Sequence, residues 1–265
     1  MRNGPKKEGP ANMKIDLSGR VAVVTGAAGE LGRVMARTLA QCGASVAVGY
    51  HHSRERALAL RDELRAKGAR ATAVQVDVGC EESVHAMRDV VTGELGEAGI
   101  VVNNAMAVYE WTTLLKQDVK DFEKVFRTCV LHNVLMAKAF VPGMIRAKWG
   151  RVIAISTECA VAAEAGTGAL VSGKRGMDGV LRVLAREVGE HNITVNQVAP
   201  GWTISDRDRA AGTERNEAYE KNVPLRRRGQ DQDIANAVAF LASDLASFIS
   251  GAFLPVCGGN VMVAI

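Results

Sequence analysis

The chain has 265 residues, of which 48% are hydrophobic and 23% are charged. This composition can bury a full core, which excludes an intrinsically disordered chain and favours a single folded α/β domain. The 33 basic and 29 acidic residues leave a formal charge of +4, so the charge gives little reason to expect nucleic acid as a partner. The one basic cluster, Arg226 to Arg228, predicts a solvated loop or the rim of a subunit interface.

The cysteine and histidine residues are informative about the cellular compartment and about metal binding. The five Cys residues form no CxxC pair, which is typical of reduced thiols in a cytoplasmic protein. The five His residues show no ligand spacing, so we expect no metal site. No apolar run predicts a membrane-spanning helix, and residues 1–16 lack the apolar core of a signal peptide. We expect a flexible leader at 1–16 and a cytoplasmic protein that binds no membrane.

The ordered part, residues 17–265, opens with a strand, a glycine-rich turn and a helix. Val21 to Val24 is an apolar run typical of a strand that is buried on both faces of a parallel sheet. The turn TGAAGELG follows, and residues 34–42 form the predicted helix. Backbone N–H groups of such a turn, together with the positive end of the helix, can bind a pyrophosphate. The pattern predicts a dinucleotide site at Gly26, Ala28, Gly29, Glu30, Leu31 and Gly32.

The end of the second predicted strand, residues 45–49, bears on the choice of dinucleotide. His51, Ser53 and Arg54 follow it, and no acidic residue does. An acidic residue at this point usually holds the ribose hydroxyls of NAD, whereas a basic residue suits the phosphate of NADP. The sequence therefore favours NADPH, with its phosphate at these three residues. The alternative is that Arg54 merely opens a polar helix that Ser53 caps.

Later segments complete a resemblance. Asp77 and Val78 follow a predicted strand at 71–76, Asn104 and Ala105 follow one at 100–102, and Pro200-Gly201 follows one at 193–198. Between them, a strand that ends at Ile155 is followed by a loop and by a helix that begins near Leu170 and carries Lys174. In this order the segments resemble the short-chain dehydrogenase/reductases. The resemblance implies a Rossmann-type, doubly wound parallel sheet in one α/β domain, and oxidoreductase activity with a nicotinamide cofactor.

The resemblance also assigns roles along the chain. It implies a substrate lid around residues 203–222 and a homotetramer or dimer that is built partly from the helices near 119–148 and 170–190. It implies a small-molecule substrate. The cofactor contacts that it adds to the glycine-rich turn come from Asp77, Val78, Asn104, Ala105, Lys174, Pro200, Gly201, Thr203 and Ser205.

The chain departs from the family pattern at the catalytic positions. The family pairs a Ser at the strand end with Tyr-x-x-x-Lys on the next helix. Here Lys174 is intact, but Leu170 stands at the Tyr position and Thr157, beside Ser156, at the Ser position. Cys129 stands where the family has a proton-relaying Asn. Because the family Tyr protonates the carbonyl oxygen, its loss removes most of the rate of carbonyl reduction.

Three hypotheses follow for the chemistry that survives. The one we favour is hydride transfer to an iminium ion, formed from a cyclic hemiaminal or imine of a specialised metabolite such as an alkaloid antibiotic, because an iminium becomes a neutral amine without a proton donor. Lys174 would then bind the cofactor ribose and Thr157 the substrate. Carboxylates near the cation would stabilise it, and the candidates are Glu158, Glu164 and Asp206. The apolar residues that suit a bulky polycyclic substrate are Met106, Trp111, Leu170 and Trp202.

The other two hypotheses do not involve hydride transfer to an iminium ion. One is reduction of a carbonyl or an enone with a substitute acid, for which Glu158, Glu164 and His132 are candidates. The other is a catalytically inactive NADP-binding sensor or partner subunit, which the several lost catalytic positions favour. Intact Lys174, Asp77 and Asn104 argue that the dinucleotide crevice persists in every case.

Overall fold

The structure, a computed structural model, describes residues 14–263. Residues 1–13 of the predicted leader lie outside the described residues. Within 14–263, a single sheet of seven parallel strands has the order β3-β2-β1-β4-β5-β6-β7. The strands are β1 (Val21–Val24), β2 (Ser45–Tyr50), β3 (Ala71–Gln75), β4 (Ile100–Asn103), β5 (Gly150–Ile155), β6 (Ile193–Pro200) and β7 (Phe253–Val256).

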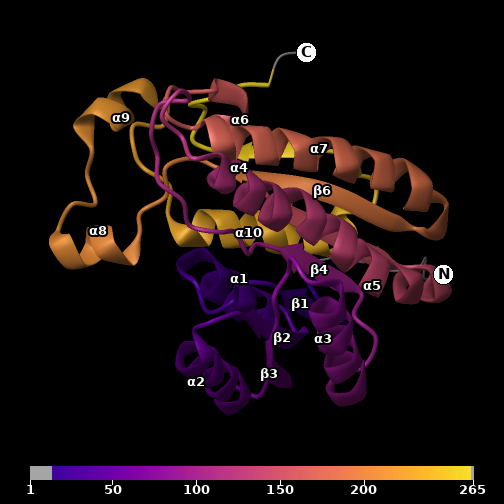
Figure 1. The fold of residues 1–265 in the computed structure, drawn as a ribbon. Coiled ribbons are helices and arrows are strands. Elements are labelled where there is room, and N and C mark those ends of the chain that lie inside the picture. Colours follow the sequence, from indigo (N-terminus) through magenta and orange to yellow (C-terminus); the bar gives the residue numbers. More distant parts are fainter. Residues whose placement is uncertain (1–13, 264–265) are drawn as a thin grey trace, which may run out of the picture.

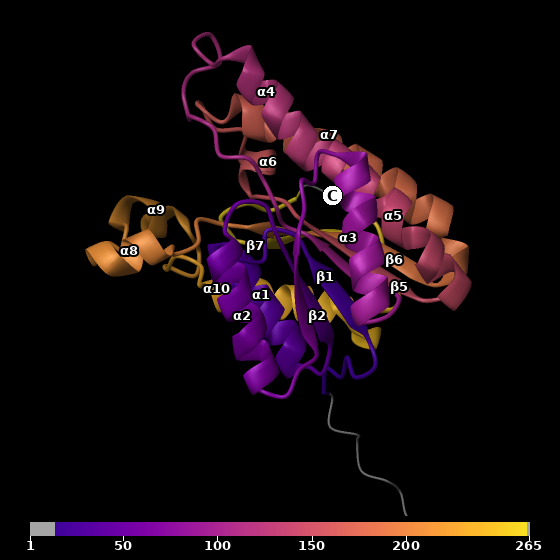
Figure 2. The ribbon, with the colours of Figure 1, turned by 60° about the horizontal axis from the view of Figure 1, so that its bottom comes forward.

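Helices cover both faces of this sheet (Figures 1 and 2). One face is covered by α1, α2 and α10, and the other by α3, α4, α5 and α7. The doubly wound, single-domain α/β fold predicted from the sequence is confirmed. The helices are α1 (Glu30–Gln41), α2 (Arg54–Ala66), α3 (Glu81–Glu94), α4 (Val119–Phe126), α5 (His132–Ala147), α6 (Cys159–Ala162), α7 (Gly168–Val188), α8 (Asp206–Ala211), α9 (Glu217–Asn222) and α10 (Asp231–Ala242).

Two hydrophobic cores result, one on each face of the sheet. Strands buried on both faces read as continuous apolar runs, and all four residues of β1 are buried. On one face, Met35 and Leu39 of α1 pack with Val238 of α10. On the other face, Met87 of α3 and Leu181 of α7 belong to the second core. The two cores fix the sheet so that the carboxyl ends of its strands form one rigid edge.

The long helix predicted over residues 119–148 is interrupted. A π-helical segment, Arg127–Leu131, separates α4 from α5. The combined stretch Val119–Ala147 is long and apolar enough to span a membrane by length and composition, which the sequence reading did not detect. Just over half of its most apolar window is buried inside the domain, as expected for a core helix, and this is weak evidence for a membrane span.

The strand order reverses between β1 and β4, which are neighbours in the sheet although β2 and β3 lie between them in sequence. In open α/β sheets, ligands bind outside the carboxyl ends of the strands at such a reversal. Helices α8 and α9, which belong to the segment predicted as a lid, stand out from the body near this edge (Figures 1 and 2). The fold therefore directs attention to the loops that follow β1, β4, β5 and β6.

The glycine-rich turn at this edge makes a first prediction about stability. A Cβ added at Gly32 would lie 2.7 Å from the Cα of Ala27 and closer still to the carbonyl oxygen of Gly26, so backbone would have to move. We expect Gly32→Ala to lower the free energy of unfolding by about 1–3 kcal/mol, measured by urea denaturation. In Gly29→Ala, a Cβ meets its nearest neighbour at 3.2 Å, so this control should fall by much less. Equal losses in the two variants would contradict the prediction.

Candidate active site

A crevice of about 780 Å³ runs along the carboxyl ends of β1 to β4. The glycine-rich turn forms one wall, and residues that follow β2, β3 and β4 form the rest. Of the predicted dinucleotide contacts, these line it: Gly26, Ala28, Gly29, Glu30, Leu31, Gly32, His51, Ser53, Asp77, Val78, Asn104 and Ala105. The structure thus brings together residues from four separate strand ends.

Hydrogen bonds from the loop after β4 hold the glycine-rich turn in place. Asn104 donates from Nδ2 to the backbone oxygens of Thr25 (3.0 Å) and Gly26 (3.2 Å). Thr25 in turn accepts through Oγ1 from the backbone N–H of Asn104 (2.9 Å) and of Ala105 (3.1 Å). Gly26 has φ +61°, and a Cβ there would lie 3.0 Å from the Cα of Ala105. Only glycine lets the two loops approach this closely.

The turn also presents a helix end to the crevice. Helix α1 begins at Glu30, and its N-cap is Gly29, which has no side chain to occupy the first-turn N–H groups. Such an end binds a diphosphate through its free N–H groups and its dipole. Glu30 is exposed in this turn, and its charge acts on Arg33 of the next turn. The residues present therefore fit a dinucleotide.

The predicted phosphate contacts after β2 do not all face the crevice. His51 and Ser53 line it, as does His52. Arg54 is the exposed first residue of α2 and is not among the described residues that line the crevice. Ser53 occupies the N-cap position of α2 and Arg54 is its first residue, as in the alternative that Arg54 merely opens a polar helix, although the side chain of Ser53 makes no capping hydrogen bond within the described residues.

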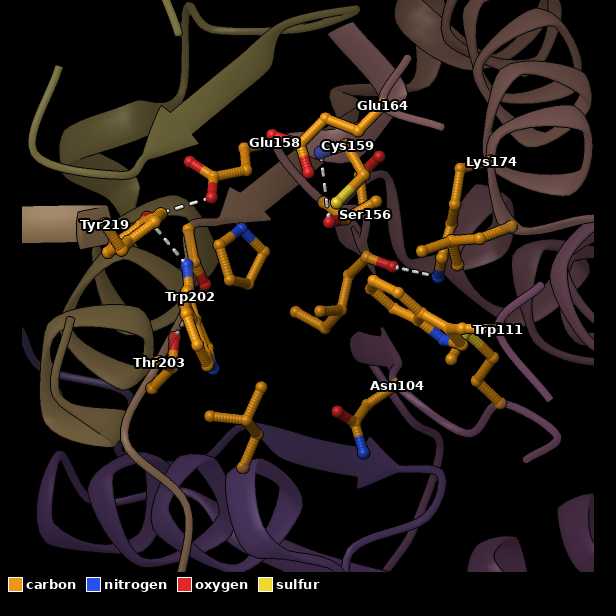
Figure 3. Close-up of a pocket in the computed structure, with 17 residues that line it drawn as sticks. Asn104, Trp111, Ser156, Glu158, Cys159, Glu164, Lys174, Trp202, Thr203 and Tyr219 are labelled. Carbon is orange, nitrogen blue, oxygen red and sulfur yellow. Dashed lines mark hydrogen bonds between the residues drawn. The ribbon is translucent and has the colours of Figure 1, made fainter. Parts of the chain in front are cut away.

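A second cavity, the chamber, opens beside the crevice and has a volume of about 670 Å³. Leu31, Asn104 and Met106 line both cavities, so the two are continuous. Figure 3 shows Trp111 and Lys174 on one side of the chamber and Trp202 and Tyr219 on the other. Its remaining lining residues are Ile155, Ser156, Thr157, Glu158, Cys159, Glu164, Leu170, Pro200, Gly201 and Thr203.

The loop after β5 and the first turns of α7 carry the predicted catalytic positions. Lys174 is 6% exposed, and its Nζ donates to the carbonyl oxygen of Ile155 at 2.6 Å. Leu170 lies one turn earlier on the same helix and is buried. The hydroxyl of Thr157 accepts from the N–H of Cys159 at 3.2 Å, and both residues line the chamber. The structure thus gathers Thr157, Leu170 and Lys174 at one wall.

Glu158 is the most constrained acid of the chamber. Its side chain is buried, and it accepts from the hydroxyl of Tyr219 at 2.9 Å and from Nδ2 of Asn260 at 3.0 Å. Tyr219 also accepts from the N–H of Trp202 at 2.9 Å. Both partners of the carboxylate are neutral, and the ion pairs found among residues 14–263 do not include Glu158. Glu164, by contrast, lines the chamber from an exposed loop.

Comparisons with known proteins agree with this arrangement. A family model described as enoyl-(acyl carrier protein) reductase matches residues 26–260. A 3-oxoacyl-acyl-carrier-protein reductase of Pseudomonas aeruginosa is 38% identical over 248 residues, which cover 94% of this chain and 100% of the relative. The chain belongs to the short-chain dehydrogenase/reductase family. It is therefore an oxidoreductase.

Two further relatives extend the comparison. A 3-oxoacyl-acyl-carrier-protein reductase of Escherichia coli is 35% identical over 249 residues, covering 94% of this chain and 100% of the relative. A solved 7α-hydroxysteroid dehydrogenase, complexed with NADH and 7-oxo glycochenodeoxycholic acid, has a TM-score of 0.85 and 31% identity and covers 94% of this chain and 97% of its own. The family and its fold are shared across almost the whole chain.

In the short-chain dehydrogenase/reductases, a lysine activates the catalytic tyrosine. The surroundings of the tyrosines near the chamber shift the pKa in the opposite direction. Burial raises the pKa of Tyr219 above its ordinary value, and the Glu158 carboxylate raises it further. Burial likewise raises the pKa of Tyr109 to about 12, and the thiols of Cys159 and Cys129 contribute. A raised pKa makes each phenol a weaker acid than usual.

The π-helical segment lies where the family has its relaying Asn. Cys129 is buried within it, and its carbonyl oxygen accepts from Nδ2 of Asn133 at 2.7 Å. Asn133 in turn accepts from Nδ2 of Asn103 at 2.7 Å. His132 follows directly and is buried, and Nδ1 of its ring lies 3.1 Å from the carbonyl oxygen of Thr128. These hydrogen bonds of the side-chain amides connect the long helical stretch to the end of β4.

The lid places two predicted site residues away from both cavities. Ser205 caps α8, accepting from the N–H of Asp208 at 3.1 Å and donating to its carboxylate at 2.8 Å. Asp206 pairs with Arg33 of α1 and with Arg209, and Arg33 holds the pKa of Asp206 below its usual range. Because both side chains are engaged in the lid, neither lines the chamber or the crevice among the described residues.

Arg226 and Arg227 of the predicted basic loop are exposed, but Arg228 is not. It is 2% exposed. It donates to the carboxylate of Asp208 at 2.7 Å and to the carbonyl oxygen of Thr203 at 3.2 Å. Its guanidinium lies 4.5 Å from the ring centre of Trp202. Arg228 therefore fixes the base of the lid and the orientation of a chamber wall, which a run of three arginines does not reveal.

Sequence reasoning missed other residues of the site. Tyr219 and Asn260 are 61 and 102 positions from Glu158 in sequence, and no local pattern links them. His52 could have been found, since it adjoins His51. Among the described residues, no group of three His, Cys, Asp or Glu side chains is placed to hold a metal ion.

The burial of His132 predicts how the stability of the protein depends on pH. Burial lowers its pKa to about 4, with the charge of Lys174 acting in the same direction, whereas an unfolded His titrates near about 6.5. Between these values the unfolded chain binds a proton that the folded chain does not. Stability should therefore be complete above about pH 6.5 and fall by about 3 kcal/mol as the pH drops towards 4.

We expect His132→Asn to flatten this dependence, measured by urea unfolding at a series of pH values. His191→Asn, at a partly exposed His, is the matched control and should keep the slope of the unchanged protein. Identical slopes in the unchanged protein and His132→Asn would contradict the assignment.

Proposed function

We propose that this protein is an NADPH-dependent reductase that transfers hydride to an iminium ion, formed from a cyclic hemiaminal or imine of a specialised metabolite such as an alkaloid. The observation that carries the proposal is the buried Glu158 carboxylate, which lines the chamber and has neutral hydrogen-bond partners. Leu170, at the position where the family has its proton donor, is the second support.

The charge of Glu158 favours a cation in the chamber. Buried charges in proteins are normally paired, because removing a carboxylate from water is costly. Two hydrogen bonds from neutral groups stabilise the carboxylate in part and leave its charge uncompensated. Two opposite unit charges 4 Å apart attract by about 4 kcal/mol at an effective dielectric constant of about 20. A cationic ligand would therefore gain substantially from this wall, and exposed Glu164 would add to the field.

The proton balance supports the same conclusion. A bound nicotinamide cofactor supplies hydride. Hydride addition to the carbon of a C=N⁺ bond gives a neutral amine, so the side chain at residue 170 has no proton to deliver. A ketone would instead become an alkoxide and would need an acid. The raised pKa values of Tyr109 and Tyr219 make both phenols poor substitutes for the lysine-activated tyrosine.

The remaining chamber residues have positioning roles in this proposal. Lys174, anchored on the carbonyl oxygen of Ile155, keeps further N–H donors for the ribose of the cofactor. Thr157 can hydrogen-bond the substrate. The exposed rings of Trp111 and Trp202 and the side chain of Met106 suit a bulky polycyclic substrate. Aromatic faces also attract cations.

The choice of NADPH rests on the crevice. No acidic residue follows β2 directly, and His51, His52 and Ser53 line the crevice there. A dehydrogenase of similar structure is described in complex with NADH, which supports a nicotinamide dinucleotide as the class of cofactor.

Carbonyl reduction is the second candidate, because two relatives of the chain are named as 3-oxoacyl-acyl-carrier-protein reductases. Tyr219 lines the chamber and would be the substitute acid. Its proton already bonds to Glu158, however, and proton loss would place a phenolate beside a carboxylate. Like charges at that distance repel, which weighs against this role.

The two candidates separate with a permanently charged substrate and a neutral counterpart. An N-methyl-dihydroisoquinolinium salt serves as the iminium and α-tetralone as the ketone, with NADPH oxidation as the readout. We expect turnover of the iminium, and we expect Glu158→Gln to lower kcat/KM for it by about 10-fold to 100-fold through loss of charge. Glu94→Gln, at an exposed acid at the end of α3, is the matched control.

Leu170→Tyr provides the complementary test. It should leave iminium turnover no faster, because that reaction takes no proton from residue 170. Strong ketone reduction by Leu170→Tyr, without iminium turnover by the unchanged protein, would instead support a carbonyl reductase that has lost its acid. Failure to bind NADPH or NADH would favour an inactive protein and remove both enzyme candidates.

We also propose that the protein forms a homo-oligomer through α5 and α7. An apolar groove of about 570 Å³ lies between them and is lined by Val134, Val141, Ile145, Val180, Val183 and Leu184. Lys138 and Glu187 lie at the same groove, so a twofold-related copy would bring opposite charges together.

The test of this interface is the mass in solution. Val183 is 55% exposed, and we expect Val183→Lys to convert a dimer or tetramer to smaller species in size-exclusion chromatography with light scattering. Val90→Lys, at an exposed valine on α3 that lies outside the groove, is the control. An unchanged mass for Val183→Lys would contradict this interface.

A further inference from the structure

Two histidine rings meet the crevice at the end of β2. His51 and His52 have ring centres 3.8 Å apart and planes inclined by 42°. Both are exposed, and both line the crevice beside Ser53. The backbone oxygen of His51 accepts from Nε2 of Gln75 at 3.0 Å, which fixes this segment to the end of β3.

Within residues 14–263, His51 and His52 are the only side chains lining the crevice that can carry a positive charge. Among the described residues that line it, none is Lys or Arg, and the acids are Glu30, from the first turn of α1, and Asp77, after β3. Arg54 opens α2 outside the lining. A phosphate that enters at the end of β2 therefore meets positive charge only when a histidine is protonated.

We propose that His51 and His52 select NADPH over NADH as protonated imidazoles, so that selectivity for NADPH rises as the pH falls through the neutral range. The inference rests on the proposed function, because it concerns the cofactor of that same site. It goes beyond that proposal by making cofactor choice depend on pH.

The direction follows from proton linkage. An unperturbed His titrates near about pH 6.5, and a neighbouring phosphate dianion stabilises the protonated ring. Binding of NADPH then takes up a proton, and its affinity weakens by up to about 10-fold for each pH unit above the pKa of the free ring. NADH lacks this phosphate, so its affinity should change little.

The number of protons taken up when NADPH binds is also limited. Two imidazolium rings with centres 3.8 Å apart repel each other, so uptake of about one proton is expected rather than two. The ester phosphate itself loses its second proton near about pH 6, so the clearest window lies between about pH 6.5 and pH 8.5.

A fixed cation would give the opposite sign. If Arg54 bound the phosphate, its charge would stay constant across this window. The growing dianionic fraction of the phosphate would then leave the affinity for NADPH constant or strengthen it as the pH rises. The sign of the pH dependence therefore distinguishes the histidine pair from the arginine.

The experiment is a titration of the full chain with NADPH and with NADH, followed by fluorescence across this pH window. We expect the Kd for NADH divided by the Kd for NADPH to fall by about 10-fold or more from the acid end to the alkaline end. Calorimetry in buffers of different ionisation enthalpy should show uptake of about one proton with NADPH and none with NADH. The double variant His51→Gln, His52→Gln should lose the slope and much of the preference for NADPH.

Arg54→Gln is the matched control and should keep the slope. A slope that persists in the double histidine variant, or that disappears in Arg54→Gln, would overturn the inference. A preference for NADPH that stays constant with pH would overturn it and leave the proposed function intact. Binding of neither dinucleotide would overturn the proposed function itself.

Discussion

A single buried carboxylate joins the segments that wall the chamber. Glu158 follows β5, and its oxygens accept from Tyr219 of α9 and from Asn260 near the C-terminus. Tyr219 extends the connection to the N–H of Trp202 after β6. A buried carboxylate must be hydrogen-bonded. These segments therefore cannot separate without exposing the carboxylate to solvent or leaving it without hydrogen-bond donors. The shape of the chamber and its negative wall therefore have the same physical origin.

The same carboxylate is the partner of the phenol of Tyr219 in the chamber. In the family, a lysine lowers the pKa of the catalytic phenol. Here Lys174 bonds to the carbonyl oxygen of Ile155, and Tyr219 bonds to an anion. The cation and the phenol of the usual pair are thus kept on different sides of the chamber (Figure 3). This separation supports the proposal of a substrate that carries its own positive charge.

The fold was predictable because its signals are local. The apolar run of β1, the glycine-rich turn and the Asn104-Ala105 pair each lie within a few residues, and each encodes a constraint on backbone approach. The charges of the lid were not predictable. Asp206 was predicted to border the substrate pocket but pairs with Arg33, which lies 173 residues away. Arg228 looked like part of a solvated run but is buried against Trp202. Such pairings are set by tertiary packing, which no short pattern records.

The crevice and the chamber differ in the charged side chains that line them. The crevice is lined by the glycine-rich turn and by His51 and His52. The chamber is lined by Leu170 and by the Glu158 carboxylate, which has no cationic partner among residues 14–263. The two cavities share Leu31, Asn104 and Met106, whereas Gly26, Ala28, Gly29, Glu30 and Gly32 of the turn line the crevice and not the chamber among the described residues. Substrate chemistry can therefore diverge from that of the 3-oxoacyl reductases while dinucleotide binding is retained.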